Sequence, residues 1–128
     1  MIMGRTLHLP LKHKWYEMIE SGYKTEEYRE VKPYWIKRLL KGAEVSFCAI
    51  DDISDDTANF YSAHPRKINE GLAFGGLART FDKVKFSFGY TKRTMMFNVR
   101  YFGVLKGKKQ WGAPSEDVFV IGLGRRIE

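Results

Sequence analysis

Apolar residues recur at helical spacing in the first third of the chain. One group falls at i, i+4, i+7 and i+8, and consists of Leu11, Trp15, Met18 and Ile19. This spacing predicts an amphipathic helix, and Ser21-Gly22 is expected to end it because glycine adopts a left-handed conformation without strain. A second apolar stripe consists of Ile36, Leu39 and Leu40. Because proline suits the first turn of a helix, a second helix is predicted from Pro33, with Gly42 as its stop.

The last third of the chain alternates between apolar and polar residues, as strands do. Val84, Phe86 and Phe88 alternate with Lys83, Lys85 and Ser87, and Gly89-Tyr90 then predicts a turn. A longer strand is predicted to about Leu105, with Met95, Phe97, Val99 and Tyr101 on one face and Met96, Asn98, Arg100 and Phe102 on the other. Shorter strands are predicted at Val118 to Leu123 and at Thr6 to Leu9, the latter ending before Pro10.

The middle of the chain is harder to interpret. Residues 44–50 predict a strand, and Asp51, Asp52, Asp55 and Asp56 then crowd a segment that we interpret as a solvated, turn-rich insertion. The acidic residues lack the central glycine and the closing glutamate of a calcium-binding EF-hand loop. A short helix is predicted around Pro65 to Leu72, followed by a break at Gly75-Gly76.

These elements define the fold class. At 128 residues, the chain is expected to form one domain over residues 1–128. Strands outnumber helices, and both helical patterns of the first third precede most strands. This order favours an α+β fold, a small mixed β-barrel with two N-terminal helices, over a doubly wound sheet.

Charge and composition narrow the possible partners. Lys plus Arg is 22 and Asp plus Glu is 15, which gives a net charge of +7. Such a balance favours a polyanion such as nucleic acid, although a basic surface that serves only solubility would look the same. Cys48 is the single cysteine, so no internal disulfide is possible. No apolar run approaches the roughly 20 residues that span a bilayer, and Arg5 and His8 interrupt any signal peptide, so a cytoplasmic protein without membrane contact is expected.

One short segment is too charged to be core. If residues 23–31 form a strand, Thr25, Glu27 and Arg29 share one face, while Glu26, Tyr28 and Glu30 share the other. Charged side chains held in register cost free energy unless they pair with each other or with a ligand. Glu27 and Arg29 therefore form either a structural ion pair or part of a cleft in which Arg29 binds phosphate. Thr25 is a candidate ligand-binding residue, but with no neighbouring histidine it is a poor nucleophile.

Lys24 also has two interpretations. It is either an exposed lysine after the helix-ending glycine or a general base whose pKa is lowered by Arg29 and partial burial. Together, Lys24 and Glu27 are the candidate acid/base pair.

Basic and aromatic residues alternate in two later loops. They are Tyr90, Lys92 and Arg93 in the first loop, and Lys106, Lys108, Lys109 and Trp111 in the second. Such mixtures suit single-stranded nucleic acid, with cations on phosphates and rings stacked on bases. The alternative is a solvated hairpin with Trp111 in the core. Trp15 is expected in the core, whereas Trp35 lies off its helix's apolar stripe and is expected to line a cleft with Arg38.

The three histidines His8, His13 and His64 are far apart and, with one cysteine, give no metal-ligand spacing. We therefore expect no metal and no cofactor.

Several runs of residues stand in an order that is typical of one known family. They are the helix with Trp15, then Gly22-Tyr23-Lys24-Thr25-Glu26-Glu27-Tyr28-Arg29, Lys32-Pro33-Tyr34-Trp35 with Arg38-Leu39, Phe88-Gly89-Tyr90, Trp111-Gly112-Ala113 and residues 118–124. These runs resemble the ASCH domain family of the PUA-like superfamily, and most closely its small stand-alone proteins from bacteria and bacteriophages. The resemblance covers residues 6–42 and 82–127, so that 43–81 resembles an insertion.

The resemblance implies a PUA-like pseudo-barrel with a cleft beside the Lys-Thr strand that binds RNA or a modified nucleoside. Some family members are amidohydrolases that deacetylate 4-acetylcytidine, with the motif Lys-Thr-x-Thr-x-Arg, and a ribonuclease activity is attributed to others. Lys24, Thr25 and Arg29 match this motif, but Glu27 replaces its second threonine, the proposed nucleophile. This departure favours binding over the known amide hydrolysis.

Three hypotheses follow. The first is an RNA- or nucleotide-binding protein whose cleft contains Lys24, Thr25, Glu27 and Arg29. The second is a hydrolase of a modified nucleoside or of RNA, with Lys24 and Glu27 as acid and base. The third is a protein-interaction module, possibly encoded by a phage, whose contact surface is the insertion at 43–81.

Overall fold

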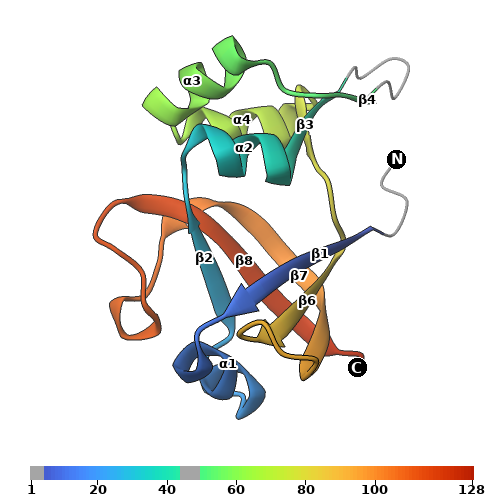
Figure 1. The fold of residues 1–128 in the computed structure, drawn as a ribbon. Helices are drawn as coiled ribbons and strands as arrows, with labels where there is room; N and C mark the ends of the chain where they lie inside the picture. The colour runs from blue at the N-terminus through green and yellow to red at the C-terminus, as the bar shows by residue number, and fades with distance from the viewer. Residues whose placement is uncertain (1–4, 44–49) are drawn as a thin grey trace.

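The computed structural model describes residues 5–43 and 50–128 (Figure 1). Its helices are α1 (His13–Glu20), α2 (Pro33–Leu39), α3 (Asp55–Ala63) and α4 (Lys67–Phe74), with a short 3₁₀ turn η1 (Lys109–Trp111). Its strands are β1 (Thr6–Leu11), β2 (Glu26–Glu30), β3 (Leu40–Ala43), β4 (Ile50–Asp51), β5 (Leu77–Arg79), β6 (Lys83–Phe88), β7 (Thr94–Lys106) and β8 (Asp117–Arg126).

A five-stranded sheet in the order β1-β6-β7-β8-β2 forms the body of the molecule. The β1–β6 pair is parallel and the other pairs are antiparallel. The sheet curls into a half-barrel, with β1 and β2 as its two edge strands (Figure 1). Because β1 and β2 do not pair with each other, side chains rather than a neighbouring strand bond backbone groups at these edges, as at His8 and Tyr28.

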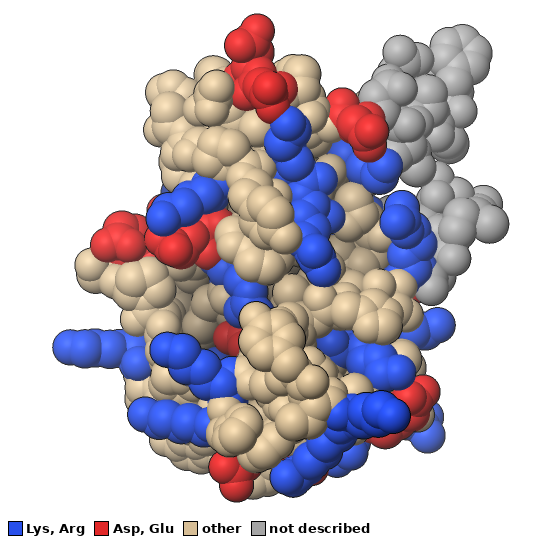
Figure 2. Space-filling view, viewed as in Figure 1, with Lys and Arg blue, Asp and Glu red and all other residues tan. Residues whose placement is uncertain are grey.

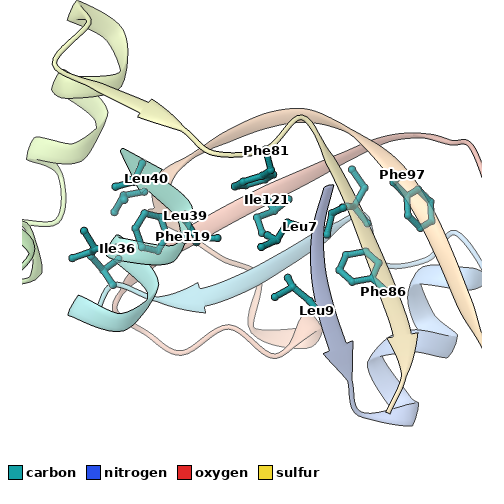
Figure 3. Close-up of a cluster of buried hydrophobic side chains, with 14 of the residues drawn as sticks. Leu7, Leu9, Ile36, Leu39, Leu40, Phe81, Phe86, Phe97, Phe119 and Ile121 are labelled. Atoms are coloured by element: carbon teal, nitrogen blue, oxygen red, sulfur yellow. The ribbon is translucent and has the colours of Figure 1, made fainter. Parts of the chain in front are cut away.

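The main core fills the concave side of the curled sheet (Figure 3). Leu9 from β1, Phe86 from β6 and Phe119 from β8 are at most 1% exposed. Ile36 and Leu39 of α2 extend this core toward the helices at one end of the barrel. β8 also buries Val118 and Val120 on its other face, against Tyr28 and Trp111. This two-sided burial explains why the sequence of β8 is almost continuously apolar.

Helices α2, α3 and α4 gather at one end of the sheet, and α1 lies at the other (Figure 1). A small second sheet, in the order β4-β3-β5, joins the first group. Asn69 ties α4 to the large sheet, because its amide donates to the Val104 carbonyl at 2.8 Å and its oxygen accepts from the Val104 N–H at 2.8 Å. Helix α4, which belongs to the segment predicted as an insertion, is therefore joined to the body of the fold.

Several local predictions are confirmed, among them the ends of α1 at Ser21-Gly22 and of α4 at Gly75, whose φ values are +85° for Gly22 and +93° for Gly75. The strand predicted to stop before Pro10 continues to Leu11. The His8 carbonyl accepts a hydrogen bond from Arg38 at the free edge of β1. The backbone nitrogen of position 10 points to this same free edge. A proline there therefore removes no hydrogen bond between β1 and β6.

Three other predictions are corrected. Helix α2 ends at Leu39 rather than at Gly42, because Leu40 already begins β3. The predicted faces of β7 change partway, since the register with β8 shifts between Phe97 and Tyr101. Tyr101 is therefore 40% exposed instead of buried.

The third correction is α3, which stands where an acidic loop was expected. The side chain of Ser54 accepts a hydrogen bond from the Thr57 N–H at 3.2 Å, and Asp55 and Asp56 occupy the first turn. Acidic residues stabilise that end of a helix. The strand predicted at 44–50 lies mostly outside the described residues.

The predicted α+β class with a curled, barrel-like sheet is confirmed, although two helices beyond the expected N-terminal pair are present in the described residues. Over residues 5–43 and 50–128, no helix is long and apolar enough to cross a membrane.

Candidate functional site

A cleft of about 450 Å³ opens between the end of β1, helix α1 and strand β2. Its lining residues come from four segments: Pro10, Leu11, Lys12, Trp15, Lys24, Glu27, Tyr28, Arg29, Glu30, Trp111 and Gly112. The cleft thus occupies the gap between the two edge strands of the half-barrel. It brings together residues from both ends of the sequence.

Burial distinguishes this cleft from the other hollows. Lys24 is 1% exposed and Glu27 is 4% exposed, and they are the buried charged residues of the described chain. Both line the cleft. A second hollow of about 450 Å³ near Lys106 and Lys109 contains no buried charge. Buried charges need a reason, and a ligand site is one such reason.

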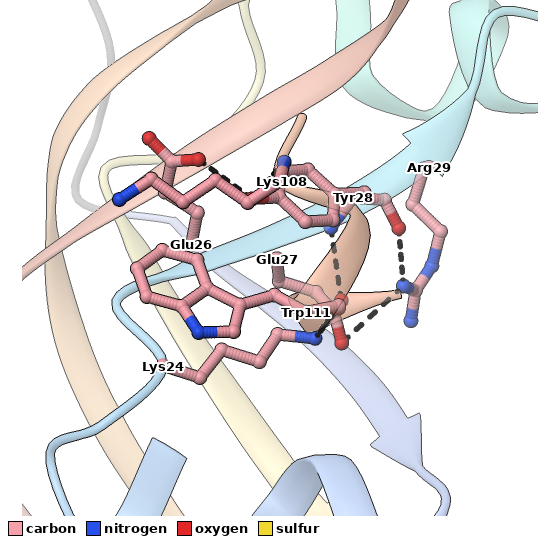
Figure 4. A network of polar contacts seen from close by, with 7 residues as sticks. All are labelled: Lys24, Glu26, Glu27, Tyr28, Arg29, Lys108 and Trp111. Carbon is pink, nitrogen blue, oxygen red and sulfur yellow. Dashed lines mark hydrogen bonds and ion pairs between the residues drawn. The ribbon is translucent and has the colours of Figure 1, made fainter. Parts of the chain in front are cut away.

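The two buried charges form an ion pair (Figure 4). Lys24 Nζ donates to Glu27 Oε1 at 3.0 Å and to the carbonyl of Trp111 at 2.8 Å. The ammonium also lies 4.4 Å from the ring centre of Trp15 and 5.6 Å from that of Tyr28. The charge is therefore compensated by a carboxylate, a carbonyl and aromatic faces rather than by water.

The local sequence explains how Lys24 reaches this position. Gly22 takes φ +85° after α1, and the Lys24 N–H then donates to the carbonyl of Met18 at 3.0 Å. The chain folds back against the helix end, so that the lysine side chain runs under Trp15. The interpretation of Lys24 as an exposed lysine is therefore wrong.

Glu27 and Arg29 cover the free edge of β2. Glu27 Oε1 accepts from the Tyr28 N–H at 2.9 Å, and Arg29 Nη1 donates to the Tyr28 carbonyl at 2.7 Å. The other carboxylate oxygen, Glu27 Oε2, lies 3.6 Å from Arg29 Nη1. Oε1 thus has two hydrogen-bond donors, whereas Oε2 has only the longer contact. Oε2 therefore retains more unused acceptor capacity than Oε1.

Two arginines flank Trp35, each bound to a different edge strand. The Cζ atom of Arg29 lies 5.1 Å from the Trp35 ring, and that of Arg38 lies 5.8 Å from it. Arg38 also donates to the carbonyl of His8 at 2.9 Å. Neither Trp35 nor Arg38 is part of the cleft lining, so the prediction that they line this cleft is wrong; Arg29, which contacts Trp35, does line it.

Trp15 does not take its expected role, whereas Trp111 follows the alternative that placed its ring in the core. Trp15 is half-buried and lines the cleft, so the prediction that it belongs to the core is wrong. Trp111 is only 7% exposed. Its ring packs in the second core cluster, and its carbonyl holds Lys24. Gly112 permits the close approach of these two segments, because a Cβ there would lie 2.8 Å from Trp15 Cζ2.

Burial is the main cause of a lowered pKa at Lys24, and Arg29 adds to it. Glu27 opposes the shift through its charge and its hydrogen bond. The amine is thus poised closer to deprotonation than an exposed lysine, with a carboxylate in contact to accept or return a proton.

The remaining predicted residues lie outside the cleft. Thr25 is exposed and is not part of the lining, and its carbonyl accepts from the Leu123 N–H. Tyr90 is 96% exposed on the β6–β7 turn, where Lys92 is also exposed. Arg93 extends over the ring of Phe88 and pairs with Glu20 at the end of α1.

The sequence analysis missed two features of the cleft. One is Lys12, which lines the cleft but was not singled out from the sequence. The Trp111 carbonyl is the other, and no sequence pattern reveals a backbone acceptor.

Basic side chains surround the cleft. Lys14 lies 4.6 Å from the ring centre of Trp15, and Lys108 lies 4.2 Å from that of Trp111. Figure 2 shows Lys and Arg over much of the face that carries β1, with Asp and Glu chiefly toward its margins. In the part of the chain that the structure describes, no group of three or more His, Cys, Asp and Glu side chains is placed to hold a metal ion.

Comparisons with protein-family models, with curated proteins and with solved structures find no match for this chain.

Proposed function

We propose that the chain binds single-stranded RNA or a nucleotide, with a base or nucleoside in the cleft between β1 and β2. The observation that carries the proposal is the buried pair Lys24–Glu27 on the floor of an open cleft whose wall is Trp15. Aromatic walls with a few convergent polar groups are typical of small-ligand sites.

The chemistry of the cleft fits a nucleobase. The half-buried face of Trp15 provides a stacking surface, and stacking on an aromatic ring is worth about 1–3 kcal/mol per base. Glu27 Oε2 can accept a hydrogen bond from an amino group of the base, and Arg29 can donate to a ring acceptor or to phosphate. Lys12, Lys14 and Lys108 supply positive charge for the flanking phosphates.

The ASCH family assignment and a PUA-like fold belong to the same proposal. The motif Lys24-Thr25 with Arg29 supports them, as does a curled sheet with the charged strand at its edge. Glu27 in the place of a threonine favours binding over deacetylation.

Fluorescence anisotropy with a labelled single-stranded RNA of mixed sequence tests the proposal. Because binding releases counterions, affinity is expected to fall steeply and log-linearly with salt concentration. Arg29→Ala and Lys12→Ala should weaken binding. Each should also reduce the slope of log affinity against log salt concentration by about one.

Lys67→Ala is the matched control, because it removes the same charge from α4, where Lys67 pairs with Glu70 outside the cleft. An affinity that does not depend on salt, or an equal loss in all three variants, would exclude the cleft as the nucleic-acid site. A thermal-shift panel of nucleosides then identifies the base, since a ligand that binds only the folded state raises Tm.

Hydrolysis of RNA or of a modified nucleoside is the second candidate function. It is favoured by the contact between an amine of lowered pKa and a carboxylate at 3.0 Å. Lys24 would act as general acid or base and exchange a proton with the substrate. Glu27 would either accept that proton from Lys24 or hold the amine in position. Turnover of 4-acetylcytidine or of RNA should then be lost in Lys24→Ala and in Glu27→Gln. No turnover by the unmutated protein on either substrate would rule out these reactions.

A further inference from the structure

A network of hydrogen bonds on the opposite face of β2 connects to the cleft through the loop 107–114. Glu26 Oε1 accepts from the Tyr28 hydroxyl at 2.7 Å, and Glu26 Oε2 accepts from the Tyr101 hydroxyl. The Tyr28 oxygen in turn accepts from the Lys108 N–H at 3.0 Å (Figure 4). The sequence analysis proposed no binding role for Glu26, Tyr28 or Tyr101. It named Lys108 only as one of the charges of the loop.

The backbone of Lys108 makes hydrogen bonds both within the loop and to Tyr28. Its carbonyl accepts from the N–H of Trp111 at 3.0 Å and from that of Ala113 at 3.2 Å. The Trp111 carbonyl then accepts from Lys24 Nζ at 2.8 Å. A continuous series of contacts therefore runs from the Tyr28 hydroxyl through the backbone of Lys108 and Trp111 to the buried amine.

Packing reinforces the same contact. Tyr28 is 7% exposed, and its ring lies so close to Gly107 that a Cβ there would be 2.8 Å from Tyr28 Cε1. The Tyr28 N–H also donates to Glu27 Oε1. Tyr28 thus contacts both partners of Lys24, one directly and one through the loop: its N–H donates to the Glu27 carboxylate, and its hydroxyl accepts from the Lys108 N–H of the loop that carries the Trp111 carbonyl.

We infer that Tyr28, oriented by Glu26, is the positioning residue that seats the loop 107–114 on the cleft and so fixes the environment of Lys24. Its hydroxyl is engaged by Glu26 and by the Lys108 N–H. Glu26 accepts from both tyrosine hydroxyls, which keeps them protonated: the pKa of Tyr101 is raised to about 12 and that of Tyr28 is also raised, mainly by burial and with the help of Glu26. The hydroxyl of Tyr28 therefore remains a donor to Glu26 over the physiological pH range, with its lone pairs directed to Lys108.

The inference rests on the proposed function only for its effect on binding. Its structural part is tested without any ligand, by amide hydrogen exchange at Lys108 and by NMR titration of the Lys24 side chain, assigned by its loss in Lys24→Met. Tyr28→Phe keeps the ring and removes the hydroxyl. Tyr23→Phe is the matched control, because Tyr23 packs edge-on against Trp111 but is 62% exposed.

In Tyr28→Phe, exchange at Lys108 should accelerate by about tenfold or more, because the amide loses its acceptor. The pKa of Lys24 should rise toward that of an exposed lysine, since a loosened loop admits water and burial is the main cause of the shift. Glu26→Ala should change both in the same direction by a smaller factor, and it carries the test if Tyr28→Phe does not fold. Tyr23→Phe should change neither.

A merely structural role would lower Tm without moving the Lys24 titration, and this result would overturn the inference. Unchanged Lys108 exchange in both Tyr28→Phe and Glu26→Ala would also overturn it. RNA affinity should fall about three- to tenfold in Tyr28→Phe. If the unmutated protein binds no RNA, the proposed function fails, while exchange and titration still decide the positioning role.

Discussion

The ammonium of Lys24 and the carboxylate of Glu27 meet at 3.0 Å while both side chains are almost completely buried. Taking two charges out of water costs several kcal/mol per ion, and pairing offsets this only where further hydrogen bonds complete the site. Here the Trp111 carbonyl and the Tyr28 N–H provide those bonds. A neutral, apolar pair of similar volume would often be as stable. The burial of this ion pair is therefore better explained by a functional role in the cleft than by a contribution of the pair to the stability of the fold.

Lys24→Met should destabilise the protein by about 3 kcal/mol, because it leaves the buried Glu27 without its main partner. Glu27 keeps the Tyr28 N–H and the longer contact with Arg29, so the loss should fall at the low end for a broken buried pair. Urea unfolding measures the difference.

Lys24→Met combined with Glu27→Gln is the control, since glutamine still accepts from the Tyr28 N–H without a charge. The double variant should be more stable than Lys24→Met alone. If it is instead less stable than the single variant, an unpaired charge on Glu27 is not what destabilises Lys24→Met. If the double variant is also much less stable than the unmutated protein, the pair contributes net stability and its burial needs no functional explanation.

Stability should also depend on pH through Lys24. Its pKa is lowered in the folded protein relative to its ordinary value of 10.5. At pH values between the lowered pKa of the folded protein and 10.5, the unfolded chain binds more protons at Lys24 than the folded protein does. The free energy of unfolding therefore rises with pH across this window. Below the lowered pKa both states carry the proton, and the contribution is absent.

The measurement is the difference in unfolding free energy between the unmutated protein and Lys24→Met from neutral to alkaline pH. Other titrating groups are common to both proteins and largely cancel. The difference should grow as pH rises toward 10.5. A difference that shrinks with pH would mean that Glu27 raises the pKa of Lys24 more than burial lowers it.

How much of this site the sequence predicted depends on how local each contact is. Glu27 and Arg29 were identified because a strand with charges on both faces does not have the pattern of a core strand. Lys24 was singled out by the resemblance to the Lys-Thr-x-Thr-x-Arg motif. The role of Trp15 was missed, because its helical spacing is that of a core residue. Its place in the cleft lining depends on a long-range contact with Gly112, which is 97 positions away in the numbering and leaves no periodic signal.

The fold shows the same division. The β pattern of the last third follows from spacing, and the C-terminal end of α1 follows from Gly22. Leu11, which was predicted as part of the helical stripe, instead ends β1, and α1 begins at His13. Helix α3 was missed because only Ala58 among its residues is buried, so no apolar stripe marks it. The change of face in β7 comes from a register shift against β8, which depends on pairing rather than on the sequence of either strand alone.

Gly112→Ala should disturb the wall of the cleft. Gly112 has φ +95°, and an added Cβ would lie 2.8 Å from Trp15 Cζ2. Backbone strain and this contact together should cost about 1–3 kcal/mol and shift Trp15 from its position. Thermal unfolding measures the loss of stability, and a change in tryptophan fluorescence reports the shift of Trp15.

Gly76→Ala provides the comparison, because nothing lies within 4 Å of a Cβ at that position. Its effect on stability should stay within about 1 kcal/mol of zero. Equal effects of the two alanines would show that Gly112 is not needed for the approach of Trp15 and the loop.

The segment 43–81 should prove to be an integral part of the fold. Asn69 of α4 satisfies both the N–H and the carbonyl of Val104, a fully buried residue of β7, at 2.8 Å each. Asn69→Ala would leave these two backbone groups without partners, and each unpaired buried group costs about 1–3 kcal/mol. We expect a loss of about 2–4 kcal/mol by urea unfolding, in a single cooperative transition, because α4 and the sheet unfold together.

Asn59→Ala is the control, since Asn59 is an exposed amide on the neighbouring helix α3. It should change stability by less than about 0.5 kcal/mol. Amide exchange separates the alternatives further. If α4 exchanges rapidly in Asn69→Ala while β7 and β8 keep their protection, the segment unfolds on its own and the insertion interpretation stands. If protection is lost in all three elements together, the helices at this end are part of the same cooperative unit as the half-barrel that carries the cleft.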